Sequence, residues 1–134
     1  GLNDIDNTLT AVQKVSNAQF AIIRNLADTE SCVIVGRCAN YVLKDHQNVL
    51  NVFIHAPIED RIKRAVTYYN LPEKNAKEAI KKMDRKRESY HNYFTDEKWG
   101  DATNYDLCLN SSLGIEECVD VIIEAARKKF HLDF

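Results

Sequence analysis

The chain has 134 residues, of which 45% are hydrophobic and 28% are charged, and its formal net charge is −2. This size suits a single domain over residues 1–134, and the balanced charge excludes a global attraction to nucleic acid or to an anionic membrane. No apolar run approaches the roughly 18 residues of a membrane span, and the first ten residues lack the pattern of a signal peptide. The four cysteines form no C-x-x-C pair, so we expect a cytoplasmic protein without disulfides or a zinc site.

The N-terminal part predicts a loose lead-in followed by a helix. Residues 1–15 are polar and weakly patterned, and we expect them to form a loop. Ser16 and Gln19 have the spacing of a capping box, which predicts that a helix begins there. Apolar residues at helical spacing then continue this helix to about Ala27.

An arginine stands where a predicted strand meets a predicted helix. The apolar run at residues 32–36 predicts a fully buried strand, and residues 38–44 predict a short helix, with Arg37 between them. Ligands of open α/β sheets bind beyond the carboxyl ends of the strands, so we expect Arg37 to face a ligand crevice. Position alone leaves an alternative open, in which Arg37 only pairs with a carboxylate at the strand end.

The middle of the chain predicts one strand and a pair of helices. Residues 49–55 are rich in Val, Phe and Ile, which favour strands. Residues 57–92 predict two helices, each with an apolar stripe, and the turn at Asn70 and Pro72 separates them. We expect these two helices to extend beyond the carboxyl edge of the sheet.

The C-terminal part predicts a loop, a third strand and a last helix. Residues 94–104 read as a loop, and residues 105–110 read as a buried strand. Residues 115–130 predict a helix that is acidic at its start and basic at its end, as the helix dipole favours. Buried strands that alternate with helices indicate an α/β fold with a parallel sheet covered on both faces.

The charges are unevenly distributed along the chain. Ten of the 18 Lys and Arg residues lie between Arg61 and Arg87, against three acids. Arg61 and Arg64 are three apart and share a helix face, and Lys81, Asp84 and Arg87 follow at three-residue steps. A carboxylate between cations can bind ribose hydroxyls while its neighbours bind phosphate oxygens. The alternative is that both helices simply present solvated charged faces.

Four segments together resemble a known family. In chain order these segments are VGRCANYVL, VFIHAPIEDRIKRA, KKMDRKRESYHNYF, and KWGD with NYDLCLNSS. This set resembles the cytidylate kinase-like family of P-loop nucleoside monophosphate kinases over about residues 17–127. The resemblance implies a three-layer α/β/α parallel sheet with a helical lid at residues 57–92. It also implies nucleotide binding and ATP- and Mg²⁺-dependent phosphoryl transfer to a nucleoside monophosphate such as CMP.

The resemblance assigns four residues to the acceptor nucleotide. Arg37 would bind the phosphate of the acceptor monophosphate. Asp84 and Arg87 match the family's D-x-x-R, so Asp84 would bind the ribose hydroxyls and Arg87 a phosphate. Lys81 occupies a position where related kinases tend to carry Arg, so it would keep the charge without the planar fork.

Four further residues would serve the transferring phosphates and the donor nucleotide. Arg61 and Arg64 match the E-x-R-x-x-R of the lid helix, which closes over the transferring phosphates, so the resemblance makes them catalytic together with Arg87. Asn110 and Ser111 follow the last strand and would lie near the adenine of ATP.

The chain departs from the family at its phosphate loop. The four glycines, at positions 1, 36, 100 and 114, form no G-x-x-x-x-G-K-[ST] motif. In the family this loop holds the ATP phosphates and Mg²⁺, so no residue of this chain is assigned to a metal. We expect the first strand and the loop to precede Gly1, and the 134-residue chain to be inactive alone.

Two other functions remain open from the sequence. A non-catalytic nucleotide- or single-stranded-RNA-binding module could use the basic helices with Tyr90, Tyr93 and Trp99 as stacking platforms. The acidic total charge counts against nucleic acid. A structural partner that kept the fold without catalysis is the other alternative. We expect small-molecule nucleotides as partners and no membrane, and the sequence fixes neither the acceptor nor the oligomeric state.

Overall fold

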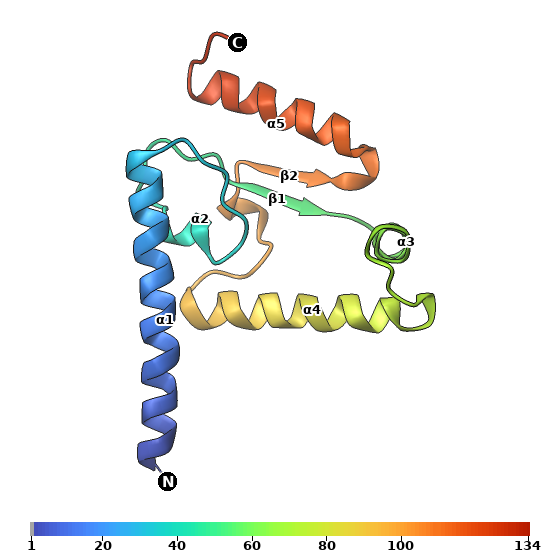
Figure 1. The fold of residues 1–134 in the computed structure, drawn as a ribbon. Helices are drawn as coiled ribbons and strands as arrows, with labels where there is room; N and C mark the ends of the chain where they lie inside the picture. The colour runs from blue at the N-terminus through green and yellow to red at the C-terminus, as the bar shows by residue number, and fades with distance from the viewer. Residues whose placement is uncertain (1) are drawn as a thin grey trace. The chain divides into compact units, whose positions relative to one another are not determined.

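The computed structural model describes the backbone of residues 2–134 and the side chains of residues 11–134 (Figure 1). The chain divides into two compact units, which are residues 1–47 and residues 48–134. Among the described residues, none of the helices combines the length and the hydropathy of a membrane-spanning helix.

The first unit consists mainly of one long helix, α1 (Leu2–Thr29). The loop predicted for residues 1–15 is therefore wrong. No glycine or proline interrupts residues 2–29, so a helix nucleated anywhere in this segment propagates through its polar part. Ser16 lies inside the helix and is buried, with 4% of its surface exposed, so it does not cap a helix start.

A short helix, α2 (Ala39–Val42), contacts α1. The Asp28 carboxylate lies 3.2 Å from Nε2 of His46, and this contact joins the last turn of α1 to the segment after α2. The helix predicted at residues 38–44 is confirmed in a shorter form.

The buried strand predicted at residues 32–36 is wrong. Residues 31–35 form no ladder with any strand of the described chain, and Val33 and Val35 are 94% and 89% exposed. An apolar, β-branched run favours a strand, but a strand exists only when a neighbour pairs with its backbone groups. No described segment provides that neighbour here.

The second unit contains a parallel pair of strands, β1 (Val52–His55) and β2 (Leu107–Asn110). Their register runs from Val52 opposite Leu107 to His55 opposite Asn110. The backbone of Asn51 continues this register, since its carbonyl accepts from Asp106 N at 2.8 Å. Two of the three predicted strands and their parallel direction are confirmed, and the sheet described has two strands.

Three helices accompany these strands. They are α3 (Ile58–Tyr69), α4 (Glu73–Phe94) and α5 (Ile115–Lys129), and the two 3₁₀ turns are η1 (Ala102–Asn104) and η2 (Ser111–Leu113). Helix α5 lies alongside β2, whereas α3 and α4 contact each other with steeply crossing axes (Figure 1). We call α3, α4 and the turn between them the hairpin. The helices predicted for residues 57–92 and 115–130 are confirmed.

The turn between α3 and α4 has a local cause. Asn70 adopts the left-handed conformation, with φ of 53°, and the Leu71 N–H donates to the Ala65 carbonyl at 3.2 Å. Asparagine tolerates this conformation better than most residues, and Pro72 then prevents α3 from continuing. Ala65 and Ala76 are buried, with 6% and 0% of their surfaces exposed, so each helix has a small buried residue.

Aromatic rings fill the space beside β1. The ring centroid of Phe53 lies 5.6 Å from that of Trp99 and 5.1 Å from that of Tyr105. Tyr90 and Tyr93 each lie 4.7 Å from the Phe94 ring, also measured between centroids. Trp99, Tyr90 and Tyr93 therefore have aromatic neighbours within their own unit, which weakens their assignment as platforms for RNA bases.

Candidate functional site

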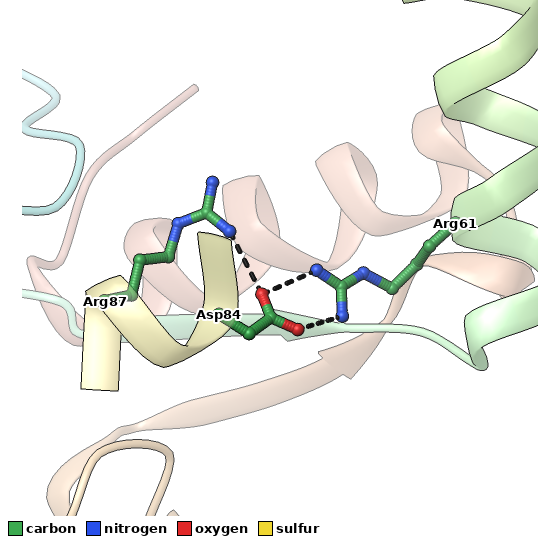
Figure 2. A network of polar contacts seen from close by, with 3 residues as sticks. All are labelled: Arg61, Asp84 and Arg87. Atoms are coloured by element: carbon green, nitrogen blue, oxygen red, sulfur yellow. Dashed lines mark hydrogen bonds and ion pairs between the residues drawn. The ribbon is translucent and has the colours of Figure 1, made fainter. Parts of the chain in front are cut away.

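The carboxylate of Asp84 binds two arginines at once (Figure 2). Arg61 donates from Nη1 to Oδ2 at 2.6 Å and from Nη2 to Oδ1 at 2.8 Å. Arg87 donates from Nη1 to Oδ1 at 3.1 Å. The planar guanidinium of Arg61 matches the two carboxylate oxygens, which is the strongest geometry for such a pair.

Three parts of the hairpin position this network. Arg61 lies in the first turn of α3, where its N–H donates to the Pro57 carbonyl at 3.2 Å. Asp84 and Arg87 lie three residues apart on α4 and so share a face. The turn at Asn70 redirects the chain from α3 into α4, which brings Arg61 opposite Asp84. The structure therefore brings together three of the predicted site residues.

The network keeps Asp84 ionised. Hydrogen bonds from Arg61 lower the pKa of the Asp84 carboxyl, burial opposes this shift, and the charges of Arg61 and Arg87 lower the pKa further. The same hydrogen bond raises the pKa of Arg61. An ionised carboxylate only accepts hydrogen bonds, which suits it to hydroxyl ligands, while the two guanidiniums leave an excess positive charge that suits phosphate.

Arg64 is held at the carboxyl edge of the two strands. Its Nη2 donates to Oγ of Ser111 at 3.0 Å, and that hydroxyl in turn lies 3.4 Å from the carbonyl of His55, to which it donates. Ser111 directly follows β2, and His55 is the last residue of β1. Ligands bind at this edge in open α/β sheets, so Arg64 stands where an anionic ligand is expected.

A second side-chain bridge joins the same elements. Oγ of Ser112 donates to Oδ2 of Asp60 in a close hydrogen bond. Asn110 accepts from the Ser112 N–H through Oδ1 at 2.9 Å, so its side chain caps the η2 turn. The assignment of Asn110 and Ser111 to adenine stays a prediction.

Arg37 lies in a backbone of unusual conformation. Gly36, Arg37 and Cys38 have φ of 71°, 56° and 57°, so three successive residues are left-handed. This conformation costs about 1–2 kcal/mol for each residue with a side chain. Arg37 belongs to the first unit, while Asp84 and Arg87 belong to the second, so their predicted shared crevice stays a prediction.

Lys81 lies on α4 three residues before Asp84, and its side chain is exposed. The structure thus places it on the same helix as the carboxylate, as predicted. Its contribution to a bound phosphate stays a prediction.

Asp60, Ser112 and His55 are members of the site that the sequence did not predict. From the sequence, Asp60 is recognisable only as an acid in the first turn of a helix, where the helix dipole stabilises its negative charge. The available signal for Ser112 was its place just after a strand, at the edge where polar side chains converge.

The described residues contain no group of three His, Cys, Asp or Glu side chains that could hold a metal ion. Mg²⁺ does not require such a group, because it usually keeps several waters and binds through one or two carboxylates together with substrate phosphates.

Comparisons with known proteins identify relatives of the chain. The model of the cytidylate kinase-like family matches residues 3–113. The solved structure of an uncharacterized protein from Eubacterium ventriosum has a TM-score of 0.82 and 37% identity, and the match covers 87% of this chain and 67% of that one. A protein named uronate isomerase from Corynebacterium glutamicum is 30% identical over 107 residues. This match covers 79% of the chain but only 21% of that curated relative, so the relative's name describes a much longer protein.

Proposed function

Because the chain belongs to the cytidylate kinase-like family, we propose that the protein transfers a phosphoryl group from ATP to a nucleoside monophosphate, with a CMP-like acceptor. The observation that carries this proposal is the network of Arg61, Asp84 and Arg87, which joins both helices of the hairpin. It combines a hydroxyl acceptor with two phosphate-binding groups, which are the two functions that a nucleotide site requires.

The chemistry of phosphoryl transfer suits such a site. Little covalent help from the protein is needed, and catalysis comes mainly from alignment and from positive charge around the transferred group. Arg61 and Arg64 lie about one turn apart on α3 and have separate anchors, Asp84 and Ser111. A helix that presents two anchored guanidiniums can bind neighbouring phosphate oxygens and exclude water from them.

On the acceptor side, we assign the phosphate to Arg37, Lys81 and Arg87, and the ribose hydroxyls to Asp84. Both oxygens of Asp84 accept from Arg61 in the structure described. A carboxylate accepts about four hydrogen bonds and Asp84 already accepts three, so two ribose hydroxyls would have to displace one arginine contact, and phosphate oxygens can bind the guanidinium that is displaced. On the donor side, the adenine is assigned to the loop of Asn110 and Ser111.

The proposal includes a three-layer α/β/α P-loop fold, which the parallel β1–β2 pair with α5 alongside β2 supports. It also includes ATP and Mg²⁺ as the family's general requirements. Mg²⁺ supplies positive charge to the phosphates when it is bound.

Steady-state kinetics test the proposal. The full-length protein is assayed with ATP and with CMP, dCMP, UMP and AMP as acceptors, and formation of ADP and of the nucleoside diphosphate is measured. We expect turnover that is fastest with CMP or a close analogue. Absence of a diphosphate product with every acceptor would contradict the kinase assignment.

A further inference from the structure

We propose that Ser111 is a positioning residue whose hydroxyl holds the guanidinium of Arg64 in place, so that the loop after β2 and helix α3 act as one unit. This inference rests on the proposed function, because it concerns how Arg64 is presented to a phosphate. In this role Ser111 binds a side chain of the protein itself, and the role does not depend on any contact between Ser111 and adenine.

The geometry around Ser111 supports this task. Its hydroxyl accepts from Arg64 Nη2 at 3.0 Å and faces the His55 carbonyl at 3.4 Å. A hydroxyl has one proton and two lone pairs, so donation to His55 turns a lone pair toward Arg64. Ser111 is 8% exposed, and this burial limits competition from water for the same contacts.

A second contact makes the connection rigid. Asp60 accepts from the hydroxyl of Ser112, and Asp60 and Arg64 are four residues apart on one face of α3. Two adjacent serines thus bind two side chains that are one helical turn apart. A two-point connection fixes the rotation of α3 about its own axis, which a single hydrogen bond would not do.

The loop is itself anchored to the rest of its unit. Asn110 caps the η2 turn through the Ser112 N–H, and the Cys118 thiol of α5 lies 3.7 Å from the Asn110 carbonyl. A displacement of the loop after β2 therefore also moves α3, because the loop is bound to both α5 and α3. We infer that a nucleotide base bound against this loop also affects the placement of Arg64.

Kinetics of matched variants test the inference in the full-length protein. Ser111→Ala should lower kcat about tenfold and leave KM for the acceptor within about twofold, because a misplaced guanidinium mainly weakens the transition state. Ser111→Thr keeps the hydroxyl and should recover most of the rate. Ser89→Ala, at an exposed site on α4, is the matched control and should leave kcat unchanged.

A double-mutant cycle shows whether Ser111 acts through Arg64. If it does, Ser111→Ala has no further effect on kcat once Arg64→Ala is present. An equal effect of Ser111→Ala on kcat in the wild type and in Arg64→Ala would overturn the inference. A Ser111→Ala variant with a raised KM for ATP and an unchanged kcat would also overturn it.

A second measurement does not require turnover. Slow rotation of the Arg64 guanidinium, followed by NMR of its Nη groups, should become fast in Ser111→Ala and stay slow in Ser89→Ala. If Ser111→Ala does not fold, Arg64→Lys tests the same pair, because it should free the Ser111 hydroxyl and lower kcat. An unchanged Arg64 signal in folded Ser111→Ala would refute the positioning role, whereas absent turnover in the wild type with a changed signal would refute only the kinase proposal.

Discussion

Arg61 and Asp84 join the two helices of the hairpin through two parallel hydrogen bonds of 2.6 and 2.8 Å. Their side chains are 31% and 26% exposed, so this pair is partly shielded from water. Arg87 adds a single contact from a more exposed position, with 53% of its side chain accessible. The pair at Arg61 thus contributes more to the hairpin than the pair at Arg87.

Removal of Asp84 should destabilise the second unit. Asp84→Ala leaves Arg61 and Arg87 close together without their shared acceptor, and we expect a loss of about 1–2 kcal/mol in the free energy of unfolding. Arg87→Ala is the control and should cost less, because its contact is single and exposed. Urea unfolding measures both, and an equal loss for the two variants would contradict the ranking.

Arg37 should matter for use of the acceptor. In the full-length protein, Arg37→Ala should weaken transition-state stabilisation by about 2–4 kcal/mol, the scale of one strong charged donor. Arg37→Lys should recover only part of this loss, since an ammonium does not reproduce the fork of a guanidinium. Values of kcat/KM with CMP measure the effect, and turnover unchanged by Arg37→Ala would remove the assignment.

Asp84 should also discriminate between sugars. If its carboxylate binds ribose hydroxyls, Asp84→Ala should lower kcat/KM for CMP more than for dCMP, which lacks one of them. The ratio of the two values is the readout, because a general loss of stability lowers both alike. An unchanged ratio would mean that Asp84 serves the hairpin and does not bind the ribose.

The stability of the second unit should fall at mildly acidic pH. Burial lowers the pKa of His91, the charge of Glu97 partly opposes this, and His91 Nε2 has no hydrogen-bond partner among the described residues. The unfolded chain, with a His pKa near 6.5, therefore binds a proton more readily than the folded one, and stability is lost as pH falls below about 6.5.

Urea unfolding between about pH 7.5 and 5.5 measures this dependence. His91→Gln removes the titrating group and should give a flatter profile than the wild type over that range. Identical profiles for the two proteins would assign the pH dependence to other groups.

Two glycines provide a matched test of steric limits. Gly100 has φ of 78°, and a Cβ there would lie 3.3 Å from the Phe53 ring. A Cβ at Gly36, with φ of 71°, would meet no atom of the described residues within 4 Å. Gly36→Ala should cost about 1 kcal/mol from backbone strain alone. Gly100→Ala should cost more, since it also crowds the aromatic cluster, and thermal unfolding that ranks the two the other way would refute this.

The sequence predicts those elements whose causes are local. The α3–α4 hairpin follows from apolar spacing and from the turn at Asn70, and these signals do not depend on distant residues. The strand predicted at residues 32–36 fails because a strand depends on a neighbour that local patterning does not reveal. The loop predicted at residues 1–15 fails because polar composition does not prevent a helix when no breaker is present.

In the candidate site, too, the features with local causes are predictable from the sequence and those that depend on distant residues are not. Arg61, Asp84 and Arg87 were recognisable as candidates from their spacing and from the family pattern. Their mutual pairing was not, because it depends on how the turn brings α3 against α4. The bridge between Asp60 and Ser112 joins positions 52 apart in sequence, and such a contact exists only in the folded chain.

The fully buried methyl group of Ala76 has a consequence for the charges of the hairpin. A methyl group is the smallest side chain after the hydrogen of glycine, so α4 can lie close to its surroundings at this point, and any larger residue has to push them apart. If a larger residue at position 76 moved α4 away from α3, the Arg61 side chain would have to span a greater distance to Asp84. The strength of an ion pair can in this way be adjusted by a residue that takes no part in it.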